Sequence, residues 1–558
     1  MTAGAGRGAS GATDADARLG GDATADVVVL GTGAAGLTAA LAAVMQGASV
    51  LLVEKTEQLG GTTAISGGTV WIPATPQAAA AGAPDSAAEA LAYLRAGGGG
   101  TERPDLLEAF VATGASMLGA VEGASPLRFV LGPQSDYHPE LPGGRLAGRS
   151  LVPAAYDPTP LGPLGERVRA STLPLDRAEQ YGSLSPVAVP SPSEGPRWIG
   201  GRALVGGLLQ AALERGVRLR LGCRARRLLV GEGGRIVGVE GVEGDPASGR
   251  VRLAARRAVV LATGGFEWSR ELVERFLPAP LEAPGSPPCI EGDGLRMAMA
   301  VGAGLGAMAE AWWSPMFRVP GETQEGAPFA RMVVSQRLYP HSIVVNRAGR
   351  RFANEAKSYH DFGRDLMAID SAALRPANRP AWLVYDAVYR RRYGTACIGP
   401  QDPDPAWLKP FATPEALAAA HGIDAAGLRE TLAAWNEDVA RGRDRAFGRG
   451  ESAYALSKGD RAQEGLARTL GPIDTPPYYA VPLHAGTLGT RGGPRTDADG
   501  SVEDAFGETL AGLFAAGNVA ASPTGLLYPG AGATLGLAMT FGWRAGVAAA
   551  GAAARSDA

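Results

Sequence analysis

The chain has 558 residues, three cysteines and a formal net charge of −3. Hydrophobic residues make up 46% and charged residues 20%, which excludes a chain that is disordered as a whole. The balanced charge gives no reason to expect a nucleic-acid partner. Three scattered cysteines without a C-x-x-C pair argue against a disulfide framework, a zinc site or an iron–sulfur cluster, and they indicate a reducing, cytoplasmic environment. We expect no bound metal.

Residues 1–25 are small and polar and lack the apolar segment of a secretory signal, so we predict a disordered tail. Two uncharged runs, 27–53 and 510–543, are long enough to cross a membrane. Both contain glycine-rich turns, which are typical of buried strands around a cofactor loop. We therefore expect no integral membrane segment, and association with a membrane surface stays open.

A complete βαβ unit is predicted near the N-terminus. Residues 26–30 form a β-branched run typical of a buried parallel strand, residues 37–46 predict an alanine-rich helix, and residues 49–53 predict the next strand. The turn after the first strand reads G-T-G-A-A-G. Such a turn between a strand and a helix is the fingerprint of a dinucleotide-binding fold.

Each glycine of this fingerprint is needed for a different physical reason. Gly31 permits the tight turn, Gly33 lets the backbone approach a pyrophosphate, and Gly36 allows the helix to pack closely on the strand. The N-terminus of the helix offers free N–H groups to the phosphates. Glu54, at the end of the second strand, can accept the ribose hydroxyls of the adenosine.

Further elements are predicted in chain order: a helix over 201–216, strands over 217–221, 227–230, 236–240 and 257–262, a helix over 295–303, a strand over 510–516 and a helix that starts near residue 532. Residues 311–479 contain more Trp, Pro and Arg and shorter apolar runs. We interpret them as a second domain inserted into the first, which then comprises 26–310 and 480–550. Residues 151–198 predict a Pro/Ser-rich surface excursion.

The cofactor is predicted to be a flavin rather than a nicotinamide. A nicotinamide domain would continue into its third strand after Glu54, but this chain continues into a second glycine-rich loop over 60–68. Further glycine-rich loops occur at 263–265 and near 517. Four such loops can converge on one long ligand and donate hydrogen bonds to the rim of an isoalloxazine.

Six segments in order give the chain a resemblance to the flavoprotein superfamily of fumarate reductases and 3-ketosteroid dehydrogenases. They are VVVLGTGAAGLTAA, EKTEQLGGTTAISGGTVWIP, VVLATGGF, VVNRAGRRFANEA, LGTRGGPRTDADG and GLFAAGNVAASPTGLLYPGAGATLG. The resemblance implies an α/β fold in which a Rossmann-type FAD-binding domain carries an inserted α+β substrate-binding, or capping, domain. FAD should be non-covalent, because Thr62 and Thr63 stand where covalent members have a His. The implied cofactor-binding residues are Gly31, Gly33, Ala34, Ala35, Gly36, Glu54, Lys55, Gly61, Thr62, Thr63, Ser66, Gly67, Gly68, Ala262, Thr263, Gly264, Gly517, Asn518, Ala533, Thr534 and Leu535.

Within the superfamily, the chain is most similar to the 3-ketosteroid Δ1-dehydrogenases. No Arg or Lys occurs over 496–543, where fumarate reductases carry an Arg, and residues 528–534 are similar to the YPGxGAT element of the steroid branch. Residues 352–359 (FANEAKSY) also match that branch. Ala531 stands where the branch commonly has Pro, which leaves open whether the substrate is a steroid or another fused-ring or terpenoid ketone.

The resemblance implies a role for each site residue. Tyr528 O–H and the Gly532 N–H bind the ketone oxygen, Tyr359 is the base that removes the α-proton, and Tyr137 hydrogen-bonds to Tyr359, although Tyr156 competes for that last role. Gly532 also suits its role because it opens a predicted helix, where the N–H is unpaired and the dipole is positive. A tyrosine base needs a neighbour that stabilises its phenolate, because a free tyrosine titrates near pH 10.

Two other functions stay open. A fumarate reductase-type enzyme acting on a dicarboxylate would need Arg331, Arg337 or Arg364 to converge into a clamp. A flavin-binding electron carrier or interaction subunit would show bound FAD without reaction with any ketone. The expected partners of an enzyme are a hydrophobic ketone and an electron acceptor that is quinone-like or of another kind.

Two further groups of residues are ambiguous in the sequence. Residues 312, 313, 316 and 317 (Trp, Trp, Met and Phe) fit the wall of an apolar pocket as well as they fit ordinary core packing. His138, His341, His360 and His484 show no metal-ligand spacing to one another.

Overall fold

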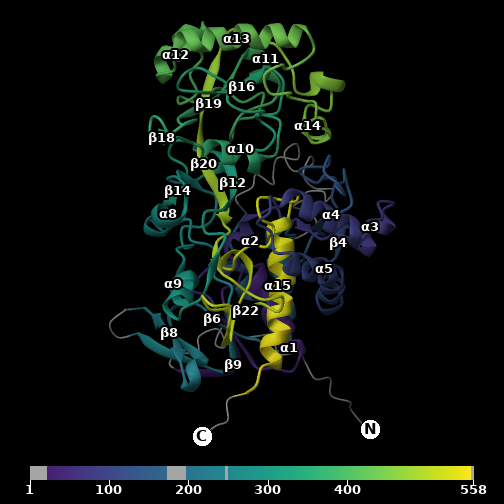
Figure 1. Ribbon diagram of the computed structural model, residues 1–558, viewed down its shortest axis with the longest axis vertical. Coiled ribbons are helices and arrows are strands. Elements are labelled where there is room, and N and C mark those ends of the chain that lie inside the picture. The colour runs from purple at the N-terminus through teal and green to yellow at the C-terminus, as the bar shows by residue number, and fades with distance from the viewer. Residues whose placement is uncertain (1–21, 172–195, 245–248, 555–558) are drawn as a thin grey trace, which may run out of the picture.

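The computed structural model describes residues 22–171, 196–244 and 249–554. Half of the predicted excursion over 151–198, residues 172–195, therefore lies outside the described residues, as does most of the predicted tail. In Figure 1 the C-terminal end of α15 (Ala533–Gly551) lies near one pole of an elongated molecule, and the helices α12 (Pro414–His421) and α13 (Ala425–Ala440) lie at the other.

The first sheet has eight strands and carries the predicted βαβ unit. Its main path runs β22 (Ser501–Glu503), β23 (Thr509–Ala515), β9 (Arg250–Leu261), β1 (Ala23–Leu30), β2 (Val50–Val53) and β6 (Arg218–Arg220), and β7 (Cys223–Val230) and β8 (Ile236–Glu243) extend it from β9. The strands from β23 to β6 are parallel, as buried Val- and Leu-rich runs predict. The predicted α/β fold is thus confirmed.

One boundary of the sequence analysis is wrong. Strand β1 begins at Ala23, inside the predicted disordered tail, because Ala23, Thr24 and Ala25 pair with residues 253–255 of β9. Their small side chains give no local strand signal, so the partner strand decides their conformation.

The helices on this sheet pack closely through glycine. Helix α1 (Ala34–Met45) lies between α7 (Gly200–Glu214) and α15 (Ala533–Gly551), and α1 and α15 run along the lower part of Figure 1. A Cβ on Gly542 or Gly546 would lie 2.5 or 2.2 Å from a carbonyl oxygen of α1. The missing side chains therefore set the distance between α15 and α1.

The second sheet has six strands and forms the other half of the molecule. Its path is β15 (Arg331–Met332), β12 (Ala311–Phe317), β20 (Tyr479–Thr490), β19 (Ala381–Tyr385) and β16 (Ser342–Asn346), with β10 (Ala283–Pro284) joined to β20. At the outer end of the second sheet, Trp435 of α13 is buried against β16 and β19 in a hydrophobic core cluster. The division of the chain at 310 and 480 stays a prediction; β20 begins at Tyr479 and belongs to this second sheet.

The remaining elements connect the two sheets or line their faces. The helices are α2 (Gly61–Ile65), α3 (Pro76–Ala80), α4 (Ala87–Gly97), α5 (Pro104–Ala124), α8 (Arg270–Phe276), α9 (Asp293–Ala300), α10 (Tyr359–Leu366), α11 (Ala387–Arg392) and α14 (Ala453–Lys458), with 3-10 segments η2 (Thr159–Arg167), η4 (Glu232–Gly234), η5 (Gly465–Arg468) and η6 (Gly517–Val519). The short strands are β3 (Val70–Trp71), β4 (Phe129–Leu131), β5 (Ser150–Pro153), β11 (Leu305–Gly306), β13 (Thr323–Gln324), β14 (Ala327–Pro328), β17 (Ile369–Asp370), β18 (Arg375–Pro376) and β21 (Gly493–Pro494).

Among the described residues, one helix is long and apolar enough to cross a membrane by length and composition. It is α5, which has 21 residues, and half of its apolar window is buried inside the protein. It packs against α15, so it has the contacts of a core helix. The two runs considered in the sequence fold instead into β1, α1 and β2 and into segments from β23 to α15.

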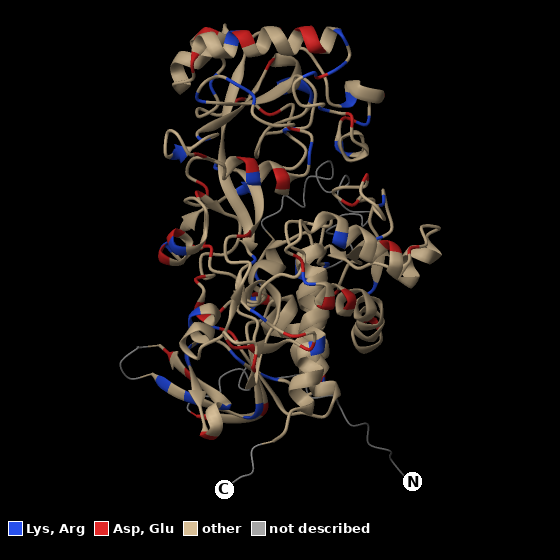
Figure 2. Ribbon diagram, in the orientation of Figure 1, with Lys and Arg blue, Asp and Glu red and all other residues tan. Residues whose placement is uncertain are grey.

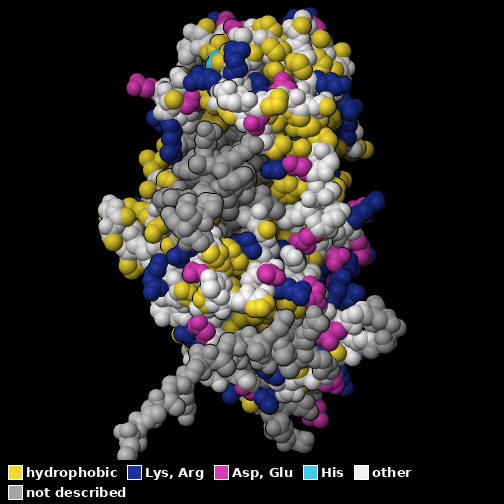
Figure 3. Space-filling model, turned by 180° about the vertical axis from the view of Figure 1, so that it is seen from behind, with side chains coloured by type: hydrophobic (Ala, Val, Ile, Leu, Met, Phe, Trp, Pro, Cys, Tyr) yellow, Lys and Arg dark blue, Asp and Glu magenta, His cyan; other side chains and the backbone are white. Residues whose placement is uncertain are grey.

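Basic and acidic residues are interspersed along the described parts of the chain (Figure 2), and the opposite face shows both signs scattered among hydrophobic side chains (Figure 3). This distribution matches the small net charge of −3.

Candidate active site

One cavity of about 540 Å³ runs from the glycine-rich turn after β1 to residues of the second half of the chain near Tyr393. It joins the two regions that the sequence analysis assigns to the cofactor and to the substrate. Nearly all the predicted cofactor residues line it; Gly36 and Ala533 are the exceptions, since Gly36 packs against Gly31 and Ala533 is buried at the start of α15.

The turn after β1 has the geometry that the glycine fingerprint predicts. Gly31 has a φ of +107°, and a Cβ there would lie 2.3 Å from the carbonyl oxygen of Ala262. A Cβ on Gly36 would lie 1.9 Å from the carbonyl oxygen of Gly31. Gly33 precedes α1 without a side-chain cap. The N-terminus of α1 therefore faces the cavity and can hold the phosphates of a dinucleotide.

Three polar side chains, those of Glu54, Lys55 and Thr263, extend this cradle along the cavity. The Glu54 carboxylate is buried and accepts hydrogen bonds from Thr32 Oγ1 at 2.6 Å and from the Thr56 N–H at 3.1 Å. Lys55 pairs with Asp293 at 2.8 Å. Thr263 Oγ1 is buried without a hydrogen-bond partner among the described residues, and Thr263 lines the cavity. A buried hydroxyl in that situation fits a polar ligand such as the rim of a flavin.

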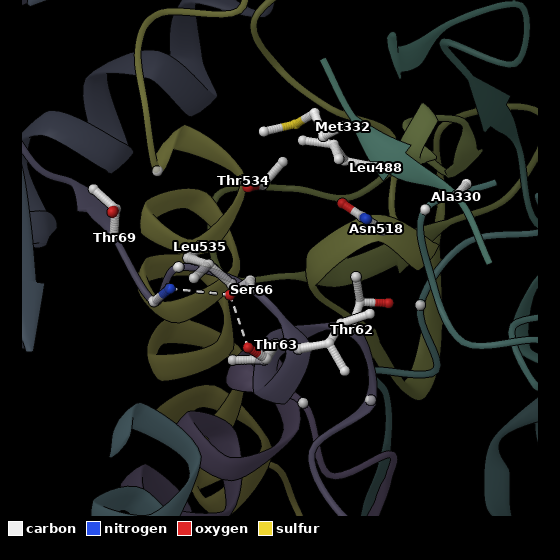
Figure 4. Close-up of a pocket in the computed structure, with 18 of the residues that line it drawn as sticks. Thr62, Thr63, Ser66, Thr69, Ala330, Met332, Leu488, Asn518, Thr534 and Leu535 are labelled. Atoms are coloured by element: carbon white, nitrogen blue, oxygen red, sulfur yellow. Dashed lines mark hydrogen bonds between the residues drawn. The ribbon is translucent and has the colours of Figure 1, made fainter. Parts of the chain in front are cut away.

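The second glycine-rich loop lies on the opposite side of the cavity from β15 and β20. Ser66 Oγ donates to the Thr63 carbonyl at 2.7 Å and accepts from the Gly68 N–H at 3.1 Å (Figure 4). Met332 and Leu488 face this loop across the cavity (Figure 4). A flat ring system can lie between a hydrogen-bonding loop and an apolar wall of this kind.

Three tyrosines predicted to be catalytic meet in the wall of the cavity. The Tyr137 hydroxyl donates to the Tyr359 hydroxyl at 2.7 Å. The ring of Tyr528 lies 5.2 Å from that of Tyr137 and 5.7 Å from that of Tyr359, measured between centroids. All three are buried and line the cavity. Tyr156, the competitor of Tyr137, lies elsewhere and donates to Gln210.

Separate elements hold these side chains in place. Tyr359 begins α10, whose N-terminus is capped by Ser358. Tyr137 lies in the loop between β4 and β5, and its N–H donates to the Pro529 carbonyl at 3.0 Å. Gly532 precedes α15 with a φ of +95°, and a Cβ there would lie 2.5 Å from the Thr69 carbonyl oxygen. Only glycine fits at position 532, and it places a helix N-terminus beside Tyr528.

The protonation of the cluster differs from the expectation. Burial raises the pKa of Tyr359 well above 10, and the pKa of Tyr137 and of Tyr528 is raised for the same reason. The sequence analysis expects Tyr137 to stabilise the Tyr359 phenolate, but burial, together with the neighbouring Tyr137 and Tyr528, raises the pKa of Tyr359. Tyr359 is therefore protonated at neutral pH and offers a small fraction of phenolate.

The sequence analysis missed Tyr454 and the role of Trp312. Tyr454 of α14 lines the cavity, its ring lies 5.6 Å from that of Tyr137, and burial raises its pKa to about 12. No quoted motif includes it, so the sequence carries no signal for it. Trp312 packs on Tyr528 at 4.6 Å. Met316 and Phe317 line the cavity, whereas Trp313 is buried in the core of the second sheet.

His360 is a buried neutral side chain behind Tyr528. Burial lowers its pKa to about 3, its Nδ1 accepts from the Trp313 N–H at 3.2 Å, and its ring lies 5.5 Å from that of Tyr528. Among the described residues, no group of His, Cys, Asp and Glu has the arrangement of a metal site.

The three arginines considered for a dicarboxylate clamp do not converge. Arg331 lines the cavity but pairs with Glu322 at 2.7 Å. Arg364 pairs with Glu310 at 2.7 Å, and Arg337 is buried and donates to the Glu355 carbonyl. Neither Arg337 nor Arg364 lines the cavity.

Comparison with known proteins agrees with this geometry. Residues 26–535 match the family model described as FAD binding domain. The chain is 40% identical to the 4-oxocyclohexanecarboxylate 2-dehydrogenase of Sinomonas cyclohexanicum, over 96% of this chain and 94% of that one. It is 35% identical to the 3-oxosteroid 1-dehydrogenase of Mycolicibacterium smegmatis, over 95% and 98%. The 3-ketosteroid delta1-dehydrogenase of Sterolibacterium denitrificans, solved with 1,4-androstadiene-3,17-dione, has a TM-score of 0.85 and 34% identity, covering 95% of this chain and 99% of that one.

Proposed function

The chain belongs to the FAD-binding flavoprotein family that includes the 3-oxosteroid 1-dehydrogenases, and we propose that it desaturates a ring ketone at the carbon–carbon bond next to the carbonyl. It is an FAD-dependent oxidoreductase of the CH–CH class. The observation that carries the proposal is the meeting of Tyr137, Tyr359 and Tyr528 with Gly532 in the cavity that holds the cofactor residues.

Tyr528 and Gly532 polarise the ketone. A hydroxyl and a helix N-terminal N–H that point at one oxygen stabilise the negative charge that develops there when the α-proton leaves. The Tyr528 side chain is buried and Gly532 is half-buried, which limits the competition of water for the oxygen. Trp312 against one side of Tyr528 and His360 against another hold the phenol in place.

Tyr359 removes the α-proton, and Tyr137 stabilises the phenolate that does so. The Tyr137 hydroxyl donates a hydrogen bond to the Tyr359 oxygen, and such a donor favours a phenolate at that oxygen. Burial and the neighbouring Tyr137 and Tyr528 nevertheless keep the pKa of Tyr359 high. The oxidation balances when the α-carbon loses a proton and the β-carbon loses a hydride. Non-covalent FAD supplies the two-electron acceptor when it is bound.

The apolar wall of the cavity favours a cyclic aliphatic ketone. Met316, Phe317, Met332, Val334 and Leu488 line it. The curated relatives are named for two such classes of substrate, oxosteroids and an oxocyclohexane. The proposal covers both, because α,β-dehydrogenation next to a ring ketone is the chemistry that they share.

The test is flavin bleaching under anaerobic conditions. Purified protein with its FAD is mixed with 4-androstene-3,17-dione or with 4-oxocyclohexanecarboxylate, and the flavin absorbance is followed. Bleaching by either ketone with formation of the conjugated enone supports the proposal. Failure of both, with reoxidation of chemically reduced flavin by fumarate, would establish the dicarboxylate enzyme instead. Failure of all three would favour the electron carrier.

A further inference from the structure

Among the residues that the structure describes, one cation in the cavity wall has no counter-charge. Four basic side chains line the cavity among the described residues: Lys55, Arg331, Arg392 and Lys458. Lys55 pairs with Asp293 at 2.8 Å, Arg331 with Glu322 at 2.7 Å and Arg392 with Asp460 at 3.0 Å. Lys458 has no ion pair and no hydrogen bond with any residue that the structure describes.

The nearest acid in the sequence does not neutralise Lys458. Asp460 accepts hydrogen bonds from Tyr393 at 2.7 Å and from Arg392 at 3.0 Å. The charge that acts on Lys458 is that of Arg461, which has the same sign. Burial together with Arg461 lowers the pKa of Lys458 to about 8, so the ammonium is still the main form at pH 7. A partly buried cation beside another cation is costly unless an anion joins it.

The position of Lys458 relative to the tyrosines indicates what that anion belongs to. Lys458 and Tyr454 are four residues apart on α14, so they share a face and their backbones are separated by about 6 Å along the helix axis. Tyr454 contacts Tyr137, which in turn contacts Tyr528. Lys458, one helical turn from Tyr454, therefore lines the same cavity as the ketone-binding groups and is linked to them through Tyr454 and Tyr137.

We infer that Lys458 binds a carboxylate on the substrate, and that the substrate class is a cyclic ketone that carries a carboxylate on the side of the ring away from the ketone. This inference rests on the proposed function, because Tyr528 and Gly532 must hold the ketone for the carboxylate to reach Lys458. A neutral steroid has no group for the ammonium. The 40% identity with an enzyme named for 4-oxocyclohexanecarboxylate agrees with this assignment.

The test compares an acid with its neutral ester. Steady-state rates of the FAD-loaded enzyme are measured with 4-oxocyclohexanecarboxylate and with its methyl ester, for the wild type, Lys458→Met, Lys458→Arg and the control Lys409→Met, which removes an exposed lysine outside the cavity. We expect Lys458→Met to raise KM for the acid by about 10-fold to 100-fold, the value of a hydrogen bond to a charged group, with kcat nearly unchanged. KM for the ester should not change, and Lys458→Arg should restore most of the binding of the acid.

A binding measurement separates recognition from chemistry. Cyclohexanecarboxylate, which has no ketone, should inhibit the wild type competitively and should lose this inhibition in Lys458→Met. If Lys458→Met changes KM equally for the acid and the ester, or lowers kcat with both, the inference is overturned while the dehydrogenase function stands. If the wild type bleaches with neither acid nor ester nor steroid, the proposed function fails instead. Should Lys458→Met not fold, failure of Lys458→Arg to bind cyclohexanecarboxylate would count against the inference in the same way.

Discussion

The hydroxyl of Tyr137 lies 2.7 Å from the hydroxyl of Tyr359, although 222 positions separate the two residues in the chain. Tyr137 is held by the Pro529 carbonyl, and Tyr359 by the capped N-terminus of α10. Because different elements supply the two hydroxyls, removing either oxygen should change the chemistry of the pair and leave the fold in place.

Tyr359→Phe should lower the rate of anaerobic flavin bleaching by about 10²–10⁴, the contribution typical of a general base. It should also stop the exchange of substrate α-hydrogens with D₂O, because no group then takes the proton. Tyr137→Phe should have a smaller effect of the same sign. Tyr385→Phe is a matched control, since Tyr385 is buried in the second sheet away from the cavity. A Tyr359→Phe variant with normal α-exchange would contradict the assignment of the base.

Tyr528→Phe should lower kcat/KM by about 10²–10³, as expected for the loss of one donor to a developing oxyanion. The flavin content and the thermal midpoint should stay close to the wild type, because Trp312 and His360 still pack on the ring. Stopped-flow bleaching and absorbance of the bound flavin measure the two quantities. If bleaching is unchanged, the ketone does not bind at this hydroxyl.

His138 links the two tyrosine-bearing segments through an ion pair. Its Nε2 lies 3.0 Å from an Asp361 carboxylate oxygen. Burial opposes the charge, but the hydrogen bond and charge of Asp361 raise the pKa of His138 above its usual 6.5, and the same pair lowers the pKa of Asp361 despite burial. A raised pKa in the folded state means that the pair stabilises the fold fully below about pH 6.5 and loses this effect as the pH rises through the folded pKa.

We therefore expect His138→Gln to reduce the free energy of unfolding at pH 6 and to have a smaller effect at pH 9. Urea unfolding at both values measures the difference. Flavin bleaching by the His138→Gln variant should also be slower than by the wild type at pH 6, because the loop that carries Tyr137 is then less firmly held to α10. A stability difference that grows with pH would show that the pair does not act in this way.

The parts of the fold that depend on local sequence were predicted correctly. The strand, glycine turn and helix of 26–46 follow from side-chain period and backbone freedom within one short segment, and the structure has β1 and α1 there. The start of β1 was wrong, since Ala23 and its neighbours are ordered by β9, some 230 residues later.

Only part of the site was predicted from the sequence, for the same reason. Tyr528 and Gly532 stand in a recognisable motif, whereas Tyr454 and Lys458 belong to a short helix with no motif. Their importance comes from packing against Tyr137 and from the missing counter-charge, which depend on contacts between distant segments. The high pKa of Tyr359 is likewise a property of burial, which the sequence does not report.

Gly36→Ala should abolish flavin binding and destabilise the fold. An added Cβ would lie 1.9 Å from the Gly31 carbonyl oxygen, and neither α1 nor the turn can move without displacing the other. Overpacking of this kind costs about 1–3 kcal/mol, occasionally more. Gly119→Ala in α5 is the control, because nothing lies within 4 Å of the added methyl. Flavin absorbance after gel filtration and the thermal midpoint report the outcome, and a yellow Gly36→Ala protein of normal stability would contradict the predicted role of the turn.

The ratio of kcat/KM for 4-oxocyclohexanecarboxylate to that for its methyl ester should fall as the pH rises through about 8. Burial lowers the pKa of Lys458 to about 8, so the free enzyme loses the ammonium above that value while the acid stays a carboxylate. Besides burial, the charge that lowers this pKa is that of Arg461, whereas Asp460 is engaged by Arg392 and Tyr393. Deprotonation of Tyr359 affects both substrates equally, so it cancels in the ratio. In Lys458→Met the ratio should be low and independent of pH, and a wild-type ratio that stays constant from pH 6.5 to about 9.5 would mean that the carboxylate is bound elsewhere.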